Sequence, residues 1–423
     1  MITSKAATFL SLSRGRSILG RTFAAVLALS LVLLPGCRRE AVPETKDDAG
    51  TLTVGSILVL SGPNSHYGED TKAGMEMGLQ YVNEQGISYT TPSGDRRDIR
   101  LNIEFKNSHG GPNNTINAPE QLQELVNAGM PVILGAFFSS VTLSLGPIAN
   151  DRGVVLLTPC STNYKLREAG PLVFRILPTD YDQAVKMADY ARDELKATKG
   201  AVLYIQNDYG QDLANTFVGR FEETGGKVVY NRFFVEGTRE FGGFINQLLD
   251  SGAEHLFLAG HTQEMVDILR TKQGTERRRN VRPLPVLGTD GMYDDSFLEQ
   301  AGDAADGIVL ASAGFDPQAN DPVVRSFVSA FQERFGREPN LWSAGGYDAV
   351  LVLAEAIRSG GPSAAGIQGG LKQIQGLSGA TGINTVDETG GMSGKEVHTF
   401  VVRGGRFERR EETSEGQIER AAA

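Results

Sequence analysis

Short apolar runs alternate with longer amphipathic segments along most of the chain. In one of the longer segments, Met75, Leu79 and Val82 recur at spacings of four and three, which places them on one face of a helix. Such periodicity predicts helices at residues 68–85, 119–128, 139–150, 182–196, 212–223, 241–250, 263–273, 295–301, 322–335 and 343–358. Short apolar runs predict strands at residues 51–60, 99–105, 132–134, 154–157, 202–205, 228–234, 255–258, 285–287, 307–311 and 397–402. Strands that alternate with helices are typical of parallel sheets covered on both faces.

The predicted strands are too many for one comfortable sheet in a chain of this size. They divide into two runs, 51–178 and 179–313, and each run has the length and pattern of one doubly wound domain. The two late helices and the C-terminal strands must complete one domain or the other. We therefore predict an α/β fold with two doubly wound, parallel-sheet lobes.

The first 36 residues contain four basic residues and no acidic one, and they include a 12-residue apolar stretch at 23–34. This stretch is too short to span a bilayer, so the pattern indicates a signal peptide over 1–36. The letters LPGC at 34–37 resemble a bacterial lipobox, in which the cysteine is lipidated. We expect lipidation at Cys37 and a flexible tether over 37–50. A stop-transfer helix, or secretion with a free Cys37, are the alternatives.

Composition excludes several classes of function. A net charge of −10 argues against non-specific nucleic-acid binding, which needs a basic surface. Two cysteines and five histidines leave little material for a disulfide scaffold or a zinc site, so we expect no metal and no cofactor. The motifs G-x-x-x-x-G-K-[ST], G-x-S-x-G, H-E-x-x-H and a post-strand G-x-G-x-x-G are also missing from the sequence. Since no nucleophile and base stand at a recognisable spacing, we do not expect an enzyme.

The ends of the predicted strands carry the candidate chemistry, because open α/β sheets bind ligands at the carboxyl ends of their strands. Ser139, at the expected N-cap of a helix, and Thr162 suit a small anion, since a helix N-terminus presents free N–H groups and a partial positive charge. Asp290 suits an ammonium group. Together the three residues describe a site for a zwitterion. Alternatively, Ser139 is an ordinary N-cap and Thr162 an ordinary turn residue.

These same segments carry a resemblance to a known family. They are 60–63 (LSGP) with 67–68 (YG), 132–140 (VILGAFFSS), 157–163 (LTPCSTN), 208–210 (DYG) and 347–349 (YDA). In this order and spacing, the chain resembles the leucine/isoleucine/valine-binding proteins, which are type I periplasmic binding proteins that serve ABC importers. The resemblance extends over most of residues 51–360.

The resemblance implies two lobes that close on a ligand and are joined by three hinge crossovers, near Pro178, Gly314 and Gly376. The implied parts are 51–178 with 314–376 for lobe 1, 179–313 with 377–412 for lobe 2, and a disordered tail at 413–423. It also implies an extracytoplasmic lipoprotein that captures a small molecule, a branched-chain-like amino acid, and delivers it to an ABC permease. The anchor would hold it to a bacterial membrane.

The resemblance also assigns a role to single residues. Ser139 and Thr162 would hold the α-carboxylate, Tyr209 and Asp290 would close on the ligand from lobe 2, and Tyr67 would cover its side chain. The implied ligand-binding residues are Tyr67, Ser139, Ser140, Cys160, Ser161, Thr162, Tyr209, His261 and Asp290. Asp290 stands where the family commonly has Glu, so the ligand must sit deeper or a water must bridge.

Several interpretations stay open at this point. Cys160 is either a reactive thiol or, as we expect, a small buried hydrophobe. His261 either confers pH-sensitive release or is an ordinary polar lining residue. Trp342 is expected as a core ring on the hinge side rather than as part of the site. A sensory module of the same fold, a binding protein for an amide or an aromatic acid, and a lipid-anchored hydrolase are the rival functions.

Overall fold

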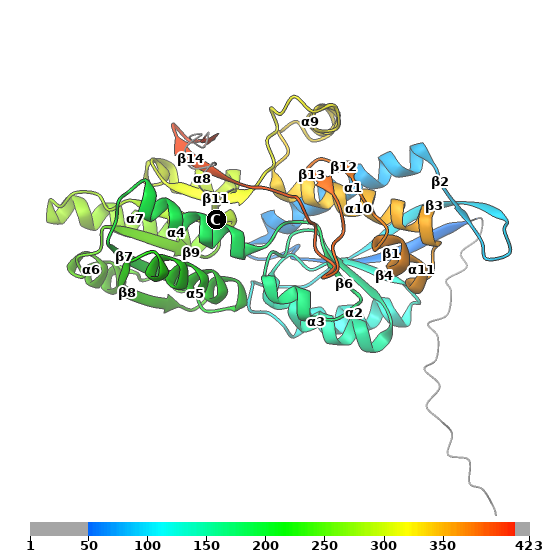
Figure 1. The fold of residues 1–423 in the computed structure, drawn as a ribbon, viewed down its shortest axis with the longest axis horizontal. Helices are drawn as coiled ribbons and strands as arrows, with labels where there is room; N and C mark the ends of the chain where they lie inside the picture. The colour runs from blue at the N-terminus through cyan, green and yellow to red at the C-terminus, as the bar shows by residue number, and fades with distance from the viewer. Residues whose placement is uncertain (1–49, 411–423) are drawn as a thin grey trace, which may run out of the picture. The chain divides into compact units, whose positions relative to one another are not determined.

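The structure, a computed structural model, describes residues 50–410. Two mainly parallel sheets are flanked by helices, as Figure 1 shows, so the predicted α/β class with two lobes is confirmed. The expected signal peptide, the lipidation site Cys37, the tether up to residue 49 and the tail at 413–423 lie outside the described residues. No helix between residues 50 and 410 combines the length and the apolar character that crossing a membrane would require.

The first lobe contains a six-stranded sheet in the order β2-β3-β1-β4-β5-β6. Its strands are β1 (Thr51–Leu58), β2 (Ile87–Thr90), β3 (Arg96–Asn107), β4 (Val132–Gly135), β5 (Val155–Thr158) and β6 (Val173–Arg175). All neighbouring strands run parallel except β2 and β3. The helices of this lobe are α1 (Ser65–Gln85), α2 (Asn117–Asn127), α3 (Ser139–Arg152), η1 (Tyr164–Glu168), α9 (Pro322–Phe335), α10 (Leu341–Gly360) and α11 (Ala364–Leu371).

The second lobe contains a seven-stranded sheet in the order β15-β14-β11-β10-β9-β7-β8. Its strands are β7 (Lys199–Ile205), β8 (Lys227–Phe234), β9 (His255–Ala259), β10 (Val286–Gly288), β11 (Val309–Ala313), β14 (Val397–Arg403) and β15 (Arg406–Arg409). Strands β14 and β15 are antiparallel additions to a parallel sheet. Its helices are α4 (Asp180–Asp193), α5 (Asp208–Glu223), α6 (Gly242–Asp250), α7 (Thr262–Arg279), η2 (Asp290–Met292), α8 (Asp295–Ala301) and η3 (Gly302–Ala305).

The chain passes between the lobes three times, and the third passage differs from the expected one. The hairpin of β12 (Leu377–Gly379) and β13 (Gly382–Asn384) stays with the first lobe, because the Asp348 carboxylate of α10 accepts the Ala380 N–H at 2.6 Å. The Arg175 N–H of β6 likewise donates to the Gly390 carbonyl at 2.9 Å. The Ser393 N–H still donates to the Thr385 carbonyl at 2.8 Å, so the crossover follows residue 393 instead of lying near Gly376. Strands β12 and β13 are short and contain no long apolar run, so the sequence pattern did not indicate the lobe on which they pack.

Helix α10 lies unusually close to α1, and this contact positions a site residue. A Cβ atom at Gly74 would lie 1.8 Å from the Ser343 carbonyl oxygen, and one at Gly346 would lie 2.2 Å from that of Thr71. Only glycine permits this approach. The helix begins at a capping box formed by Asn340 and Ser343, two residues earlier than predicted. The contact thus holds the first turn of α10 where Trp342 packs against Tyr67, which follows β1, and Phe137, which follows β4.

The pattern of apolar residues missed strand β2, which pairs with the start of β3. In β2 only Ile87 is buried, and the facing residues 96–98 of β3 are charged and exposed. A hairpin of this kind buries little apolar surface, so neither alternation nor a continuous apolar run reveals it. The hairpin lies at the edge of the sheet, away from the strand ends that form the site.

Candidate ligand-binding site

Loops at the carboxyl ends of strands from both sheets converge on one small cavity. Its volume is about 20 Å³, roughly the space that a single water molecule needs. The first lobe contributes Tyr67, Phe137, Phe138, Ser139, Cys160, Thr162 and Trp342, and the second contributes Tyr209, His261, Asp290 and Gly291. Seven of the nine predicted ligand-binding residues therefore lie together. The other two, Ser140 and Ser161, lie outside the cavity lining.

Asp290 follows strand β10 and begins the short turn η2, which carries its side chain into the cavity. The carboxylate is 1% exposed and accepts hydrogen bonds from the Tyr209 hydroxyl at 2.6 Å and from the Gln183 amide at 2.7 Å. Burial raises its pKa, while hydrogen bonds from Tyr209, Gln183, the Gly291 N–H and Thr162 oppose that rise. Asp290 is therefore a desolvated acid that neutral donors hold in place.

Gln183 supports Asp290 from helix α4, and the sequence reasoning did not single it out. Its amide oxygen accepts the Asp290 backbone N–H at 2.9 Å, while its amide nitrogen donates to the carboxylate. Asp180 lies one helical turn earlier on the same helix and is also buried, and burial raises its pKa well above the usual range. A polar residue on the buried face of a predicted helix, beside Ala184, was the signal that could have identified Gln183.

The first lobe places hydroxyl groups opposite Asp290. The Thr162 hydroxyl faces the Asp290 carboxylate across the boundary between the lobes, where it helps to lower the pKa of that group. Ser139 is the first residue of α3 rather than its N-cap; Phe138 occupies the cap position without a side-chain bond. The Ser139 Oγ accepts the Asn163 N–H at 3.3 Å. The helix begins one residue earlier than an N-cap at Ser139 would require, because the Phe138 carbonyl already accepts the Thr142 N–H at 3.0 Å.

The two serines outside the cavity make other contacts. The Ser140 Oγ accepts the Asp208 N–H at 3.1 Å, so it caps the first turn of α5 in the opposite lobe. The Ser161 hydroxyl donates to the Phe137 carbonyl at 2.9 Å and lies 2.7 Å from the Thr142 Oγ1. Ser161 thus ties two loops of the first lobe together, whereas Ser140 ties the lobes to each other.

Tyr67 connects the lobes directly. Its hydroxyl donates to the Gly291 carbonyl at 2.9 Å and accepts the Thr262 N–H at 3.1 Å, and it shares a 2.7 Å hydrogen bond with the Thr262 hydroxyl. Its ring stacks on Phe137 with centroids 4.7 Å apart. The predicted cover over the cavity therefore also bonds to the opposite lobe.

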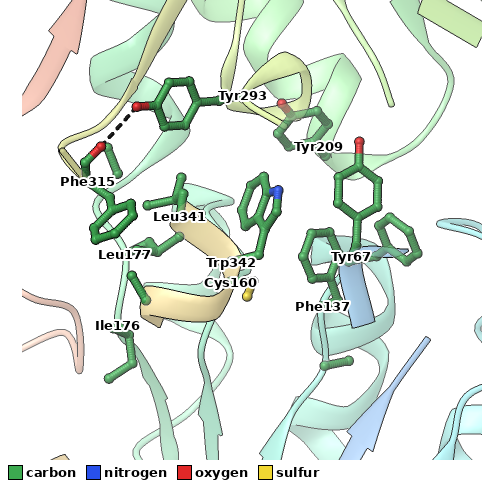
Figure 2. Packing of buried hydrophobic residues seen from close by; sticks show 14 of the residues in the cluster. Tyr67, Phe137, Cys160, Ile176, Leu177, Tyr209, Tyr293, Phe315, Leu341 and Trp342 are labelled. Atoms are coloured by element: carbon green, nitrogen blue, oxygen red, sulfur yellow. Dashed lines mark hydrogen bonds between the residues drawn. The ribbon is translucent and has the colours of Figure 1, made fainter. Parts of the chain in front are cut away.

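Trp342 lines the cavity, so its expected place in the hinge-side core is corrected. Its ring makes edge contacts with Phe137 at 4.9 Å and with Tyr67 at 5.7 Å between centroids. Figure 2 shows the indole between Cys160 and Tyr209, with its nitrogen directed toward the space beside Tyr67. A single tryptophan at a helix start gives no periodic signal, and the close packing of α1 and α10 decides where it lies.

The titratable neighbours of the cavity are held neutral by burial. Burial lowers the pKa of His261 to about 3, and its ring stacks on Tyr209 with centroids 5.1 Å apart. Burial raises the pKa of the Cys160 thiol, which lies 3.4 Å from the Thr71 hydroxyl. A thiol held protonated is a poor nucleophile. Within residues 50–410, no three His, Cys, Asp or Glu side chains come together as a metal ion would need.

Comparisons with known proteins agree with this architecture. A family model described as "Periplasmic binding protein" matches residues 51–405. A Leu/Ile/Val-binding protein homolog of Brucella melitensis is 24% identical over 352 residues, which cover 82% of this chain and 90% of the relative. A leucine-binding protein of Thermotoga maritima superposes with a TM-score of 0.76 at 24% identity, over 85% of this chain and 98% of that one. A solute-binding protein of R. palustris, solved with 4-hydroxybenzoate, superposes with a TM-score of 0.75 at 19% identity, over 86% of this chain and 96% of that one.

Proposed function

We propose that this chain, which belongs to the periplasmic binding protein family, captures an amino acid between its two lobes and delivers it to the membrane permease of an ABC importer. The ligand would be bound and released chemically unchanged. A lipid on Cys37 would hold the protein to the membrane. The names of the relatives favour a branched-chain amino acid as the starting hypothesis.

The proposal depends most on Asp290. This carboxylate is buried, and among the described residues that line the cavity none is a lysine or an arginine. A desolvated negative charge without a cationic partner favours a ligand that brings an ammonium group. Ser139, at the start of a 14-residue helix in the opposite lobe, favours a carboxylate, because the first turn presents free N–H groups. The Asp290 carboxylate and the start of helix α3 at Ser139 together match the ammonium and carboxylate groups of an amino acid.

The same geometry supports capture by lobe closure. Tyr67 and Ser140 of the first lobe bond to residues of the second lobe, Tyr67 at the cavity and Ser140 beside it. A ligand stabilises the closed arrangement only through contacts that it gains there, and a shift from 1:99 to 99:1 needs about 5.5 kcal/mol. Two or three charge-assisted hydrogen bonds, at about 1.5–3 kcal/mol each, supply that amount.

An aromatic acid is the second candidate ligand, because aromatic rings dominate the cavity lining and a structural neighbour was solved with 4-hydroxybenzoate. Asp290 argues against it, since a benzoate has no ammonium group to balance the buried carboxylate. An amide ligand, and a sensory role in place of transport, are further alternatives.

A thermal-shift screen of the purified protein against the twenty amino acids, acetamide and 4-hydroxybenzoate tests the ligand class. We expect at least one amino acid to raise the melting temperature, because a ligand that binds only the folded state stabilises it by mass action. Mass spectrometry should then recover that amino acid unchanged. Stabilisation by 4-hydroxybenzoate alone would contradict the proposal. Loss of uptake of the labelled amino acid in a deletion strain supports transport, and unchanged uptake supports sensing.

A further inference from the structure

Two polar atoms at the cavity have no hydrogen-bond partner among the residues that the structure describes. They are the indole nitrogen Nε1 of Trp342 and the ring nitrogen Nε2 of His261. Both side chains line the cavity and are at most 5% exposed. In Figure 2 the indole nitrogen is directed toward the space bounded by Tyr67 and Tyr209. The other polar groups there, including Asp290, are already bonded within the protein.

An unpartnered N–H inside a protein carries a free-energy cost, so native structures rarely retain one without a reason. The indole N–H is a donor only, and it therefore requires an acceptor. The neutral ring of His261 has one donor and one acceptor nitrogen, so Nε2 can pair with a group of either kind. Both requirements are met by one small neutral group with an oxygen, such as a hydroxyl or a carboxamide.

The other residues that line the cavity also favour a small polar group over a branched aliphatic side chain. Among the described residues that line the cavity, none is a leucine, isoleucine, valine or methionine. The rings of Tyr67, Phe137 and Trp342 pack against one another and leave a cavity of about 20 Å³. A branched aliphatic side chain would displace these rings and would cover the indole N–H without pairing it. A compact polar side chain would need less displacement and would pair it.

We propose that the ligand is a compact amino acid whose side chain carries a hydroxyl or carboxamide oxygen that accepts a hydrogen bond from the Trp342 indole. The same group pairs with His261 Nε2. This inference rests on the proposed function, because it assumes that the amino-acid head group lies between Ser139 and Asp290. It assigns selectivity to Trp342 and His261, neither of which touches the head group in this arrangement.

Calorimetry with two near-isosteric pairs of ligands tests the inference: L-threonine against L-valine, and L-asparagine against L-leucine. The members of each pair have similar volume and differ mainly in hydrogen-bonding groups. We expect the polar member of at least one pair to bind about tenfold or more tightly, because the apolar member leaves buried polar atoms unpaired. Comparable or tighter binding of valine and leucine would overturn the inference.

Variants locate the selectivity. Trp342→Phe removes the N–H and keeps an aromatic ring, so the preference for the polar ligand should fall to within about threefold while affinity for the apolar member is kept. His261→Phe provides the second variant, in case the first fails to fold. His255→Phe, which changes a buried histidine in the core of the second lobe, is the matched control. Unchanged selectivity in both cavity variants would contradict the assignment.

Trp342 is the only tryptophan of the chain, so its fluorescence reports on this contact directly. A hydrogen bond from the indole N–H shifts emission to longer wavelength, and we expect that shift with the polar ligand and not with its apolar analogue. The outcomes also separate the two proposals. Tight binding of apolar amino acids overturns the selectivity and leaves the proposed function intact. No binding of any amino acid overturns the proposed function, and the selectivity with it.

Discussion

The two walls of the cavity differ in chemistry. The first lobe contributes four aromatic rings, a thiol and the hydroxyls of Tyr67, Ser139 and Thr162, all uncharged, whereas the second contributes the carboxylate of Asp290. That carboxylate is held by residues of its own lobe, Tyr209 and Gln183. Shape and charge are therefore separated: the first lobe shapes the cavity, and the second holds its charge in a fixed position.

Replacing the charged group should break this division most strongly. In Asp290→Ala the ammonium group of the ligand loses its counter-charge and its hydrogen bond, so affinity for the best-bound amino acid should fall about 10- to 100-fold. Calorimetry measures the change. Asp303→Ala removes an exposed carboxylate of the same lobe and should have no effect. An affinity unchanged in Asp290→Ala would contradict the ammonium site.

The lobes should also differ in their response to acid, because both of the most buried histidines, His255 and His261, lie in the second lobe. Burial lowers the pKa of His255 to about 4 from the usual 6.5. The unfolded chain therefore takes up a proton that the folded chain refuses, and stability falls as the pH drops from about 6.5 toward 4. At pH 5 this histidine should reduce the free energy of unfolding by about 2 kcal/mol.

Urea unfolding of His255→Leu at pH 7.5 and pH 5 checks this value. The difference in stability between the two pH values should be about 2 kcal/mol smaller than in the wild type. His109→Asn, which changes an exposed histidine of the first lobe, should keep the wild-type difference. Equal pH dependence in all three proteins would show that His255 titrates normally.

The uncharged wall can be tested through Tyr67. Tyr67→Phe keeps the ring and removes the hydroxyl that bonds to Thr262 and Gly291 of the second lobe. Closure should be weakened, and affinity should fall about fivefold because the Gly291 carbonyl and the N–H and hydroxyl of Thr262 lose their partner. Calorimetry gives the affinity, and small-angle scattering gives the dimensions of the free and bound protein. Tyr81→Phe, on the exposed side of α1, is the control, and identical behaviour of the two variants would contradict this role.

The smallest effect is expected at Ser140, which bonds to the second lobe away from the cavity. Ser140→Ala leaves the Asp208 N–H without its acceptor across the lobes, but water can replace a bond at a helix end. Affinity should fall about two- to threefold, through faster ligand release measured by stopped-flow. Ser144→Ala, whose hydroxyl bonds within its own helix, should match the wild type. A tenfold loss at Ser140 would instead indicate direct contact with the ligand.

Prediction from the sequence succeeded where one local pattern was sufficient. The apolar strands and the amphipathic helices specified the α/β class, and the rule of carboxyl strand ends led to the segments around Ser139, Thr162 and Asp290. Prediction from the sequence failed at Gln183 and Trp342. A single polar residue on a helix, or a single aromatic residue, does not create the periodic pattern on which the prediction depended. The sequence prediction also placed the third crossover too early. Strands β12 and β13 have three residues each, which is too short for a pattern that indicates the lobe on which they pack.

The sequence by itself determined which segments become strands and helices, because burial of alternating or periodic apolar residues is a local requirement. It also determined the family, through motifs in a fixed order. Only the tertiary structure decided which side chains share the cavity. The approach of α10 to α1 across Gly74 and Gly346 brings Trp342 beside Phe137, and the position of α4 brings Gln183 to Asp290. These distances depend on how separate elements pack, which no single stretch of sequence encodes.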